Sequence, residues 1–216
     1  MLKNQVKEIS RQALQRLPSY LNYLKKRKEE GVINISSPMI ALELHLNEVQ
    51  VRKDLASVSR SEGRPKTGHN VERLIDDIET FLGYNNVDHA VIVGVGQLGR
   101  ALLNYKGFEN YGLEIIAAFD NDESLANQEI NNVKVSSIAK LEDLVRRLQV
   151  HIGIITVPAS CAQEICDKLI KGGVLAIWNF APVNLKVPDY ILVHNENMAA
   201  SLAVLSRHLK EKMAKR

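Results

Sequence analysis

The sequence predicts an α/β chain with a small helical domain first, a parallel-sheet domain second and an amphipathic helix last. Three observations predict this arrangement. Helix-start signals and helical apolar spacing fill the first third of the chain. Short apolar runs then alternate with helical segments, which is typical of a parallel sheet. A stripe of apolar residues at helical spacing ends the chain. We expect domains at residues 1–84, 85–195 and 196–216.

The composition is that of an ordinary globular protein, with 45% hydrophobic and 25% charged residues. No apolar run approaches the length of a membrane span and the polar N-terminus is no signal peptide, so we expect a cytoplasmic protein without a membrane partner. The net charge of +3 is unevenly distributed. Residues 1–84 carry 14 basic and 11 acidic side chains, residues 85–206 carry 9 and 13, and residues 207–216 carry 5 and 1. The basic flanks indicate contact with an anionic polymer or, alternatively, a solvated surface.

Proline, glycine and capping residues predict the first helices. We expect residues 3–15 to form a short helix that ends before Pro18, because proline inside a helix breaks a hydrogen bond. A second helix starts at Pro18 and continues to Gly31. Ser37 then caps a third helix, which ends near residues 45–46.

That third helix and the next one, at residues 47–58, have the layout of a helix-turn-helix. Asn47 is a natural N-cap for the second of them, with Gln50 three residues later as in a capping box. Its exposed side carries Gln, Arg, Lys and Ser, which pair with bases and phosphates in a major groove. The alternative is that these side chains face solvent on an ordinary packing of three helices.

A glycine-rich basic loop at residues 60–69 follows and favours a winged-helix domain that binds double-stranded DNA. Its Gly63-Arg64-Pro65 segment suits backbone phosphates or a narrow minor groove. An apolar stripe from Val71 to Leu82 then predicts a helix that Gly83 ends. The predicted DNA contacts are Asn47, Gln50, Arg52, Lys53 and Ser57 on the helix and Arg60, Arg64, Lys66 and His69 on the wing.

Three glycines follow the apolar run at residues 89–93 and predict a nucleotide site. Gly94 allows a tight turn, Gly96 lets a pyrophosphate approach the backbone, and Gly99 lets the next helix lie close to the strand. A second apolar run ends at Asp120, 21 residues past Gly99 (120 − 99), where an NAD-binding Rossmann domain has an acid for the ribose 2′-hydroxyl. This acid repels a 2′-phosphate and so favours NAD over NADP. The alternative is a structural acid after an ordinary strand–helix turn.

Two further loops leave the same edge of the predicted sheet, after the strands at residues 152–157 and 174–178. Ligands bind at this edge of open parallel sheets, so we expect both loops to contact the cofactor. The alternative is that they are plain connections. The predicted NAD(H) contacts are Gly94, Val95, Gly96, Gln97, Leu98, Gly99, Asp120, Val157, Pro158, Asn179, Phe180, Ala181 and Pro182.

The last helix follows a strand at residues 190–193. Its Met198, Leu202, Leu205 and Leu209 form one apolar stripe. No chain remains to cover that stripe, so we expect it to pack on a second subunit in a homodimer.

The sequence offers no catalytic group and no metal site. Cys161 and Cys166 lie five residues apart on a predicted helix, a spacing that suits neither a metal site nor a redox motif, and we expect two packed thiols. His151 opens a strand and His194 has no evident partner, so an NAD-dependent oxidoreductase lacks its proton-transfer group. That oxidoreductase, and a Rossmann protein that binds coenzyme A or a plain nucleotide, are the alternatives to a DNA-binding protein.

Seven segments together resemble the bacterial Rex family of redox-sensing transcriptional repressors. They are Arg16-Leu17-Pro18-Ser19-Tyr20-Leu21, Val51-Arg52-Lys53-Asp54-Leu55, Gly94-Val95-Gly96-Gln97-Leu98-Gly99, Ala117-Ala118-Phe119-Asp120, Val157-Pro158-Ala159, Asn179-Phe180-Ala181-Pro182 and Glu196-Asn197. The resemblance implies a homodimer that binds inverted-repeat operators, holds two NAD(H) molecules, exchanges its C-terminal helices between subunits and leaves DNA when NADH accumulates. It also implies that Arg16 and Tyr105 lie at the hinge and couple the two sites.

Two segments depart from the pattern of this family. The family's wing usually carries more glycine and aromatic residues, whereas this chain has a longer loop at residues 60–66 followed by Gly68-His69. At Ala199 the family typically has an aspartate that reaches the partner's hinge. We therefore expect a dinucleotide-responsive DNA-binding protein whose switch is altered.

Overall fold

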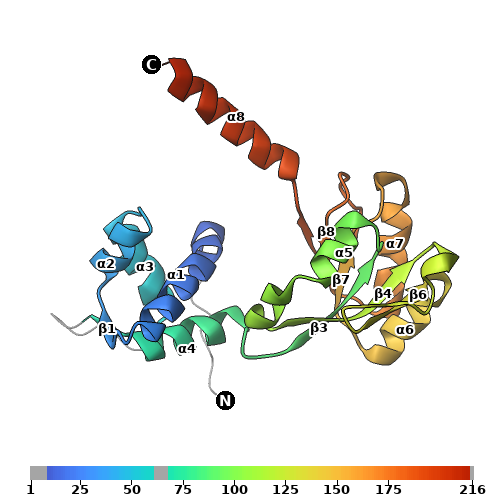
Figure 1. Ribbon diagram of the computed structural model, residues 1–216, viewed down its shortest axis with the longest axis horizontal. Helices are drawn as coiled ribbons and strands as arrows, with labels where there is room; N and C mark the ends of the chain where they lie inside the picture. The colour runs from blue at the N-terminus through green and yellow to red at the C-terminus, as the bar shows by residue number, and fades with distance from the viewer. Residues whose placement is uncertain (1–8, 61–67, 215–216) are drawn as a thin grey trace. The chain divides into compact units, whose positions relative to one another are not determined.

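The computed structural model describes residues 9–60 and 68–214 (Figure 1). Contacts divide the chain into two compact units, Met1–Asn86 and Val87–Arg216, which we call the N-terminal unit and the C-terminal unit. The described part of the N-terminal unit contains α1 (Arg11–Glu29), β1 (Asn34–Ile35), α2 (Ser37–Glu43), α3 (Glu48–Val58), β2 (His69–Asn70) and α4 (Val71–Leu82).

The N-terminal unit has one apolar core to which its helices contribute. Fully buried side chains come from α1, α3 and α4, and they include Leu17, Tyr20, Leu24, Leu55 and Ile78. The strands β1 and β2 pair antiparallel, with Ile35 opposite His69. The predicted stripe of α4 is buried on one side, and the helix ends at Gly83 in the left-handed conformation as predicted.

Three predicted helix boundaries in this unit were wrong. A single helix, α1, runs through Pro18 where we expected a break. Proline removes one hydrogen bond, but buried side chains on both sides of it hold the two halves of α1 in the same core. Ser36, rather than Ser37, caps α2, and that helix already ends at Glu43.

The C-terminal unit is built on a seven-stranded sheet with the order β5-β6-β4-β3-β7-β8-β9. Its strands are β3 (Asp88–Val93), β4 (Leu113–Asp120), β5 (Glu129–Ile130), β6 (Val133–Ser137), β7 (Ile152–Ile155), β8 (Ala176–Asn179) and β9 (Leu192–Asn195). All neighbours pair parallel except β5, a short antiparallel edge strand that we did not expect. Because β4 and β7 lie on opposite sides of β3, the chain reverses its strand order at β3, where a doubly wound sheet binds its ligand.

Helices cover both faces of this sheet (Figure 1). Alternate residues of β3 point to opposite faces, so Val91 and Val93 enter one core and Ala90 and Ile92 enter the other. The first core includes α6 (Leu141–Leu148) and α7 (Ala159–Gly172). The second includes α5 (Gln97–Leu103) and the 3₁₀ helix η1 (Lys106–Tyr111). The sheet and its flanking helices thus form the predicted Rossmann arrangement.

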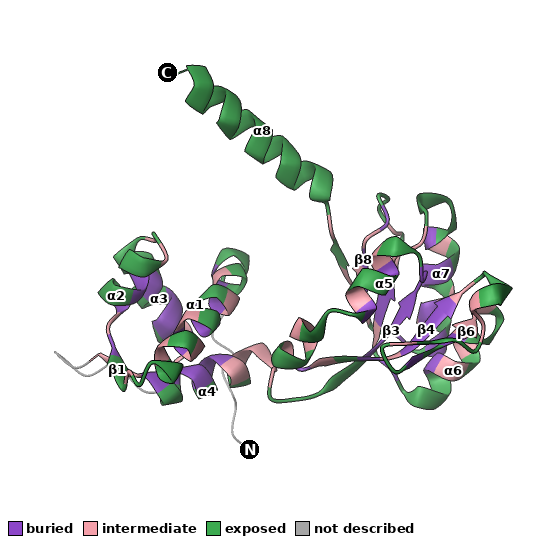
Figure 2. Ribbon diagram, viewed as in Figure 1, coloured by how far each residue is buried: buried purple, intermediate pink, exposed green. Residues whose placement is uncertain are grey.

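The last helix, α8 (Met198–Ala214), has no buried residue (Figure 2). The predicted stripe is present on it, and its side chains are 56–67% exposed at Met198, Leu202, Leu205 and Leu209. Such a run of exposed apolar side chains is unusual on a free surface and is typical of a contact with another chain.

Candidate nucleotide site and DNA interface

Two of the three predicted glycines, Gly94 and Gly96, lie in the turn between β3 and α5, and Gly99 lies in the first turn of α5. Gly94 has a φ of +97°, and a Cβ there would lie 2.9 Å from the Thr156 carbonyl carbon. A Cβ on Gly99 would lie 1.9 Å from the Gly94 oxygen, so α5 approaches the turn more closely than any larger residue allows. Gly96 differs, because a Cβ there would meet nothing within 4 Å. Two glycines therefore serve the fold, and the third leaves bare backbone facing open space, as a bound pyrophosphate requires.

Asp120 lies beside this turn because β4 pairs parallel with β3. Its Oδ2 accepts a hydrogen bond of 2.5 Å from the Val95 amide, and its Oδ1 accepts one of 2.9 Å from the Asp122 amide. The predicted ribose acid and the glycine turn are thus brought together across 25 residues of sequence. Asp120 also holds the turn itself, a role that the sequence analysis missed.

Thr156 is a second residue that the sequence analysis missed. It follows β7, and its single hydroxyl proton is shared between the carbonyl oxygens of Val93 (3.0 Å) and Gly94 (2.7 Å). The loop that contains Val157 and Pro158 is therefore tied to the glycine turn. A polar residue at the end of the buried run of β7 was the available signal.

The side chain of Asn179 fixes the second predicted cofactor loop, at residues 179–182, by hydrogen bonds. Its side chain is fully buried, and its Nδ2 donates to the carbonyls of Ala181 and Val183 and to Asn195 Oδ1. Its Oδ1 accepts from the Ala181 amide. These bonds fix the backbone of residues 179–183 and join it to β9. The amide of Asn179 is thus engaged within the protein, while Phe180, Ala181 and Pro182 line a pocket.

That pocket has a volume of about 420 Å³ and lies between residues 180–184 and residues 195–199. Ala199 forms part of its wall. Glu196 lies between two neighbours there, since its Oε1 accepts from Trp178 Nε1 at 2.9 Å and lies 3.2 Å from His194 Nε2. Residues 94–99 are not among those that line it. The glycine turn and this pocket are both at the carboxyl edge of the sheet but form separate features.

A row of aromatic rings leads from Tyr105 toward the pocket. Ring centroids are 4.9 Å apart between Tyr105 and Phe108, 5.6 Å between Phe108 and Trp178, and 5.0 Å between Trp178 and Phe180. Tyr105, the predicted coupling residue of this unit, is 53% exposed at the outer end of the row. The sequence analysis missed Phe108, whose place depends on the η1 segment lying over the sheet.

In the N-terminal unit, α3 is the helix that we predicted to enter the major groove of DNA. The Asn47 side chain caps it through the Gln50 amide at 3.2 Å, as predicted. The Gln50 side chain does not return to Asn47 as a capping box requires, because its Nε2 donates to Asp54 Oδ1 at 2.9 Å. Arg52 and Lys53 are exposed, whereas Ser57 is half-buried and donates to the Asp54 carbonyl at 2.6 Å.

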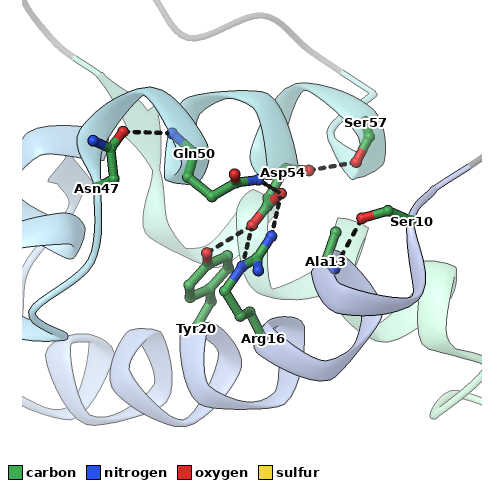
Figure 3. A network of polar contacts seen from close by, with 8 residues as sticks. All are labelled: Ser10, Ala13, Arg16, Tyr20, Asn47, Gln50, Asp54 and Ser57. Atoms are coloured by element: carbon green, nitrogen blue, oxygen red, sulfur yellow. Dashed lines mark hydrogen bonds and ion pairs between the residues drawn. The ribbon is translucent and has the colours of Figure 1, made fainter.

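Asp54 is the centre of a polar network (Figure 3). Its side chain, on α3, is 3% exposed, and it accepts hydrogen bonds from Arg16 Nε (2.8 Å), Arg16 Nη2 (3.1 Å) and Tyr20 Oη (2.8 Å) on α1. Burial alone raises the pKa of Asp54, but the bonds from Arg16, Gln50 and Tyr20 outweigh it and hold the pKa below its usual value. Burial and the carboxylate raise the pKa of Tyr20 to about 12. The network is therefore ionised at Asp54 and neutral at Tyr20 near pH 7.

The described residues of the predicted wing are held by the body of the N-terminal unit. Arg60 Nε lies 3.5 Å from Asp77 Oδ1, and its backbone amide donates to Asp77 Oδ2 at 3.0 Å. His69 lies in β2, and its burial lowers its pKa. Arg64 and Lys66 lie outside the described residues.

We also searched the described residues for metal-binding groups, membrane-spanning helices and reactive thiols. Their His, Cys, Asp and Glu side chains include no group of three or more that could hold a metal ion. None of their helices has both the length and the apolar character to cross a membrane. Burial raises the pKa of Cys166 to about 11, as fits a packed thiol. Cys161 is exposed, so the expectation of two packed thiols was wrong for that residue.

Comparison with known proteins identifies the family. Residues 85–183 match the family described as "CoA binding domain", and residues 8–56 match "Putative DNA-binding protein N-terminus". A redox-sensing transcriptional repressor Rex of Treponema denticola is 42% identical over 193 residues, which cover 89% of this chain and 91% of that protein. The chain belongs to the Rex family. A Rex repressor of Carboxydothermus hydrogenoformans is 40% identical over 203 residues, or 94% of this Rex-family chain and 97% of its relative.

Solved structures agree with this membership. RSP, a Rex-family repressor, is 33% identical, and its crystal structure has a TM-score of 0.85 over 96% of each chain. RSP in complex with NAD⁺ and operator DNA has a TM-score of 0.89 over 96% of this chain and 95% of RSP, and RSP with NADH has one of 0.84 over 95% and 96%. This Rex-family chain is therefore a redox-sensing transcriptional repressor. Its predicted order of winged-helix domain, Rossmann domain and last helix is confirmed.

Proposed function

We propose that this repressor binds operator DNA through its N-terminal unit, binds NAD(H) at the glycine turn of its C-terminal unit, and releases DNA when NADH binds. The observation that carries the proposal is the bare backbone at Gly96, next to Asp120 and at the strand where the sheet order reverses. The RSP structures with NAD⁺, NADH and operator DNA support it.

In the nucleotide site, the pyrophosphate lies over the bare backbone of Gly96, at the N-terminus of α5, where backbone amides favour an anion. The Asp120 carboxylate accepts from the ribose 2′-hydroxyl, and it disfavours NADP because a 2′-phosphate would lie against a negative charge. Val157 and Pro158, with Phe180 to Pro182, contact the nicotinamide end, and Asn179 fixes the backbone of its loop. The cofactor supplies a redox state that is sensed rather than used in a reaction.

In the DNA site, α3 enters the major groove of double-stranded operator DNA. Arg52 and Lys53 are its exposed cations, and the loop of residues 60–69 contacts the flanking backbone. The two sites are coupled through Arg16 in the N-terminal unit and Tyr105 in the C-terminal unit. A coupling of roughly 1–3 kcal/mol, or about 5- to 150-fold in affinity, is sufficient for regulation, and operator DNA then weakens NADH binding by the same factor.

The domains are residues 1–84 for DNA, 85–195 for the cofactor and 196–216 for the exchanged helix of a cytoplasmic homodimer. Its two-fold symmetry matches an inverted-repeat operator. The exposed apolar stripe of α8 supports this assembly.

Replacing Leu205 by glutamate is expected to convert the dimer to a monomer, because a carboxylate would then be buried in an apolar contact. Sedimentation analysis measures the change. Operator affinity is expected to fall as well, because a monomer can place its DNA-binding unit on only one half-site. The control is Ala203→Glu, which adds the same charge to α8 away from the stripe and leaves the dimer intact. A dimer that survives Leu205→Glu contradicts the assembly.

The central experiment is a fluorescence titration of Trp178 with NADH, repeated with NAD⁺, NADPH and an operator duplex selected from random sequence by the protein. NADH is expected to quench Trp178, whose ring centroid lies 5.0 Å from that of Phe180 in the pocket wall. The NADH affinity measured in this way is expected to be lower when operator is present. Operator affinity that is the same at every ratio of NADH to NAD⁺ would contradict the proposed function.

Lys53→Ala is expected to abolish specific operator binding and to leave the NADH signal unchanged, because Lys53 is exposed on α3 in the other unit. Loss of one phosphate contact also reduces the slope of log affinity against log salt by about 0.9. Lys26→Ala is the matched control, since Lys26 is also an exposed lysine and lies on α1. Equal losses in both variants would show that only total charge matters.

A further inference from the structure

The network around Asp54 fixes the exposed side chain of Gln50 on α3. Three donors from α1 and one from Gln50 saturate the Asp54 carboxylate, at distances of 2.8 to 3.1 Å. Figure 3 shows Arg16 and Tyr20 reaching Asp54 from α1, while Gln50 reaches it along α3. Gln50 is exposed, whereas Asp54 is buried. The network therefore connects the core of the N-terminal unit to a predicted base-contacting residue.

The charge of Asp54 determines which end of the Gln50 amide faces outward. A glutamine amide can present either its oxygen or its nitrogen to a neutral neighbour. An ionised carboxylate only accepts hydrogen bonds, so it binds the Nε2 of Gln50 and excludes the Oε1. Arg16 keeps Asp54 ionised by pairing with both of its oxygens. The Oε1 and the second Nε2 hydrogen of Gln50 are thus left for a ligand.

This pair of groups matches one base. Adenine presents an N6 donor and an N7 acceptor in the major groove, and a glutamine reads it with one acceptor and one donor. We propose that Asp54 is a positioning residue for base recognition, which orients the Gln50 amide so that Gln50 reads one adenine in each half-site. The inference rests on the proposed function, because it requires α3 to lie in the major groove of an operator.

The first test measures base preference on the operator duplex selected by the unchanged protein, with each base pair substituted in turn. Gln50→Ala is expected to remove the preference for adenine at one position of each half-site, a discrimination of about 5- to 150-fold. Preferences at the other positions remain. An unchanged protein that selects no sequence contradicts the proposed function. A selected operator whose preferences all survive Gln50→Ala leaves the proposed function standing and overturns the inference.

The second test asks whether Asp54 acts through Gln50. In Asp54→Asn a neutral amide, which both accepts and donates hydrogen bonds, replaces the carboxylate. Either end of the Gln50 amide can then face outward, so the preference for adenine at that position falls. In a Gln50→Ala background the same substitution has no preference left to reduce, and a double-mutant cycle measures this dependence. A structural role alone would weaken all duplexes equally in both backgrounds and would overturn the inference.

Because Asp54→Asn also breaks the pair with Arg16 and can unfold the unit, a third readout uses the unchanged chain. The side-chain amide hydrogens of Gln50, assigned by their loss in Gln50→Ala, are followed by NMR hydrogen exchange. We expect one of them to exchange more slowly than those of Gln15, an exposed glutamine on α1. Equal exchange at Gln50 and Gln15 would show that Asp54 does not hold the amide in solution.

Discussion

Replacing Gly96 by alanine is expected to weaken NADH binding by roughly 10- to 100-fold while the protein without ligand stays as stable as before. The added Cβ meets no protein atom within 4 Å, and Gly96 has a φ of −70°, which alanine adopts without strain. The methyl group instead occupies the space that we assign to the pyrophosphate. Trp178 fluorescence measures NADH affinity, and thermal unfolding with and without NADH separates binding from folding.

Gly99→Ala is the contrasting variant, three residues later in the first turn of α5. Its Cβ would lie 1.9 Å from the Gly94 oxygen, a backbone atom that cannot move without shifting β3 or α5. We expect a lower unfolding temperature even without NADH. If Gly96→Ala binds NADH like the unchanged protein, the nucleotide does not lie over Gly96 and the assigned site is wrong. If both variants lower the unliganded unfolding temperature equally, the space over Gly96 is closed in solution.

The features that the sequence predicted well depend on neighbouring residues. The glycine spacing, the Asn47 cap and the Gly83 ending are local signals, and each is found where it was expected. The alternation of apolar runs with helices predicted the parallel sheet for the same reason. Asp120 was found beside the turn because parallel pairing of β3 with β4 follows from that alternation.

The features that it missed depend on contacts between distant segments. Asp54 was overlooked because its burial depends on Arg16 and Tyr20, which precede it by 38 and 34 residues. Pro18 was expected to break α1 because the local cost of proline is known, whereas the compensating burial on both sides of it is tertiary. Thr156 acts on the glycine turn across 62 residues. Contacts between side chains of separate elements are thus hard to predict from a single sequence.

The ion pair between Arg16 and Asp54 leads to the largest expected effect on stability. Arg16→Ala is expected to lower the free energy of unfolding of the N-terminal unit by about 3 kcal/mol, because it leaves a buried carboxylate without its cation. The Arg16 and Asp54 side chains are 24% and 3% exposed. Tyr20 and Gln50 still donate to Asp54, which places the loss at the lower end of the range for such pairs. Urea unfolding followed by circular dichroism measures it.

Lys28→Ala is the matched control, because the Lys28–Glu72 pair also joins α1 to a neighbouring helix and is as short, at 2.7 Å, but its side chains are 52% and 75% exposed. Water replaces the partner there, so little change in stability is expected. A loss in Lys28→Ala equal to that in Arg16→Ala would contradict the argument from burial.

Acid is expected to reduce the effect of Arg16→Ala. In the unchanged protein the pKa of Asp54 is held below its usual value of 3.8, so its stabilising contribution is present above that pH and is lost as the pH falls through the lowered pKa. In the variant, Asp54 lacks the bonds and the charge of Arg16 that favour its ionised form, so it gains a proton at a higher pH than in the unchanged protein. The stability difference therefore shrinks as the pH falls below 3.8 and through the lowered pKa of Asp54. A stability difference that is the same at pH 7 and at a pH where Asp54 is protonated in both proteins would show that Arg16 stabilises the unit by packing instead of by charge.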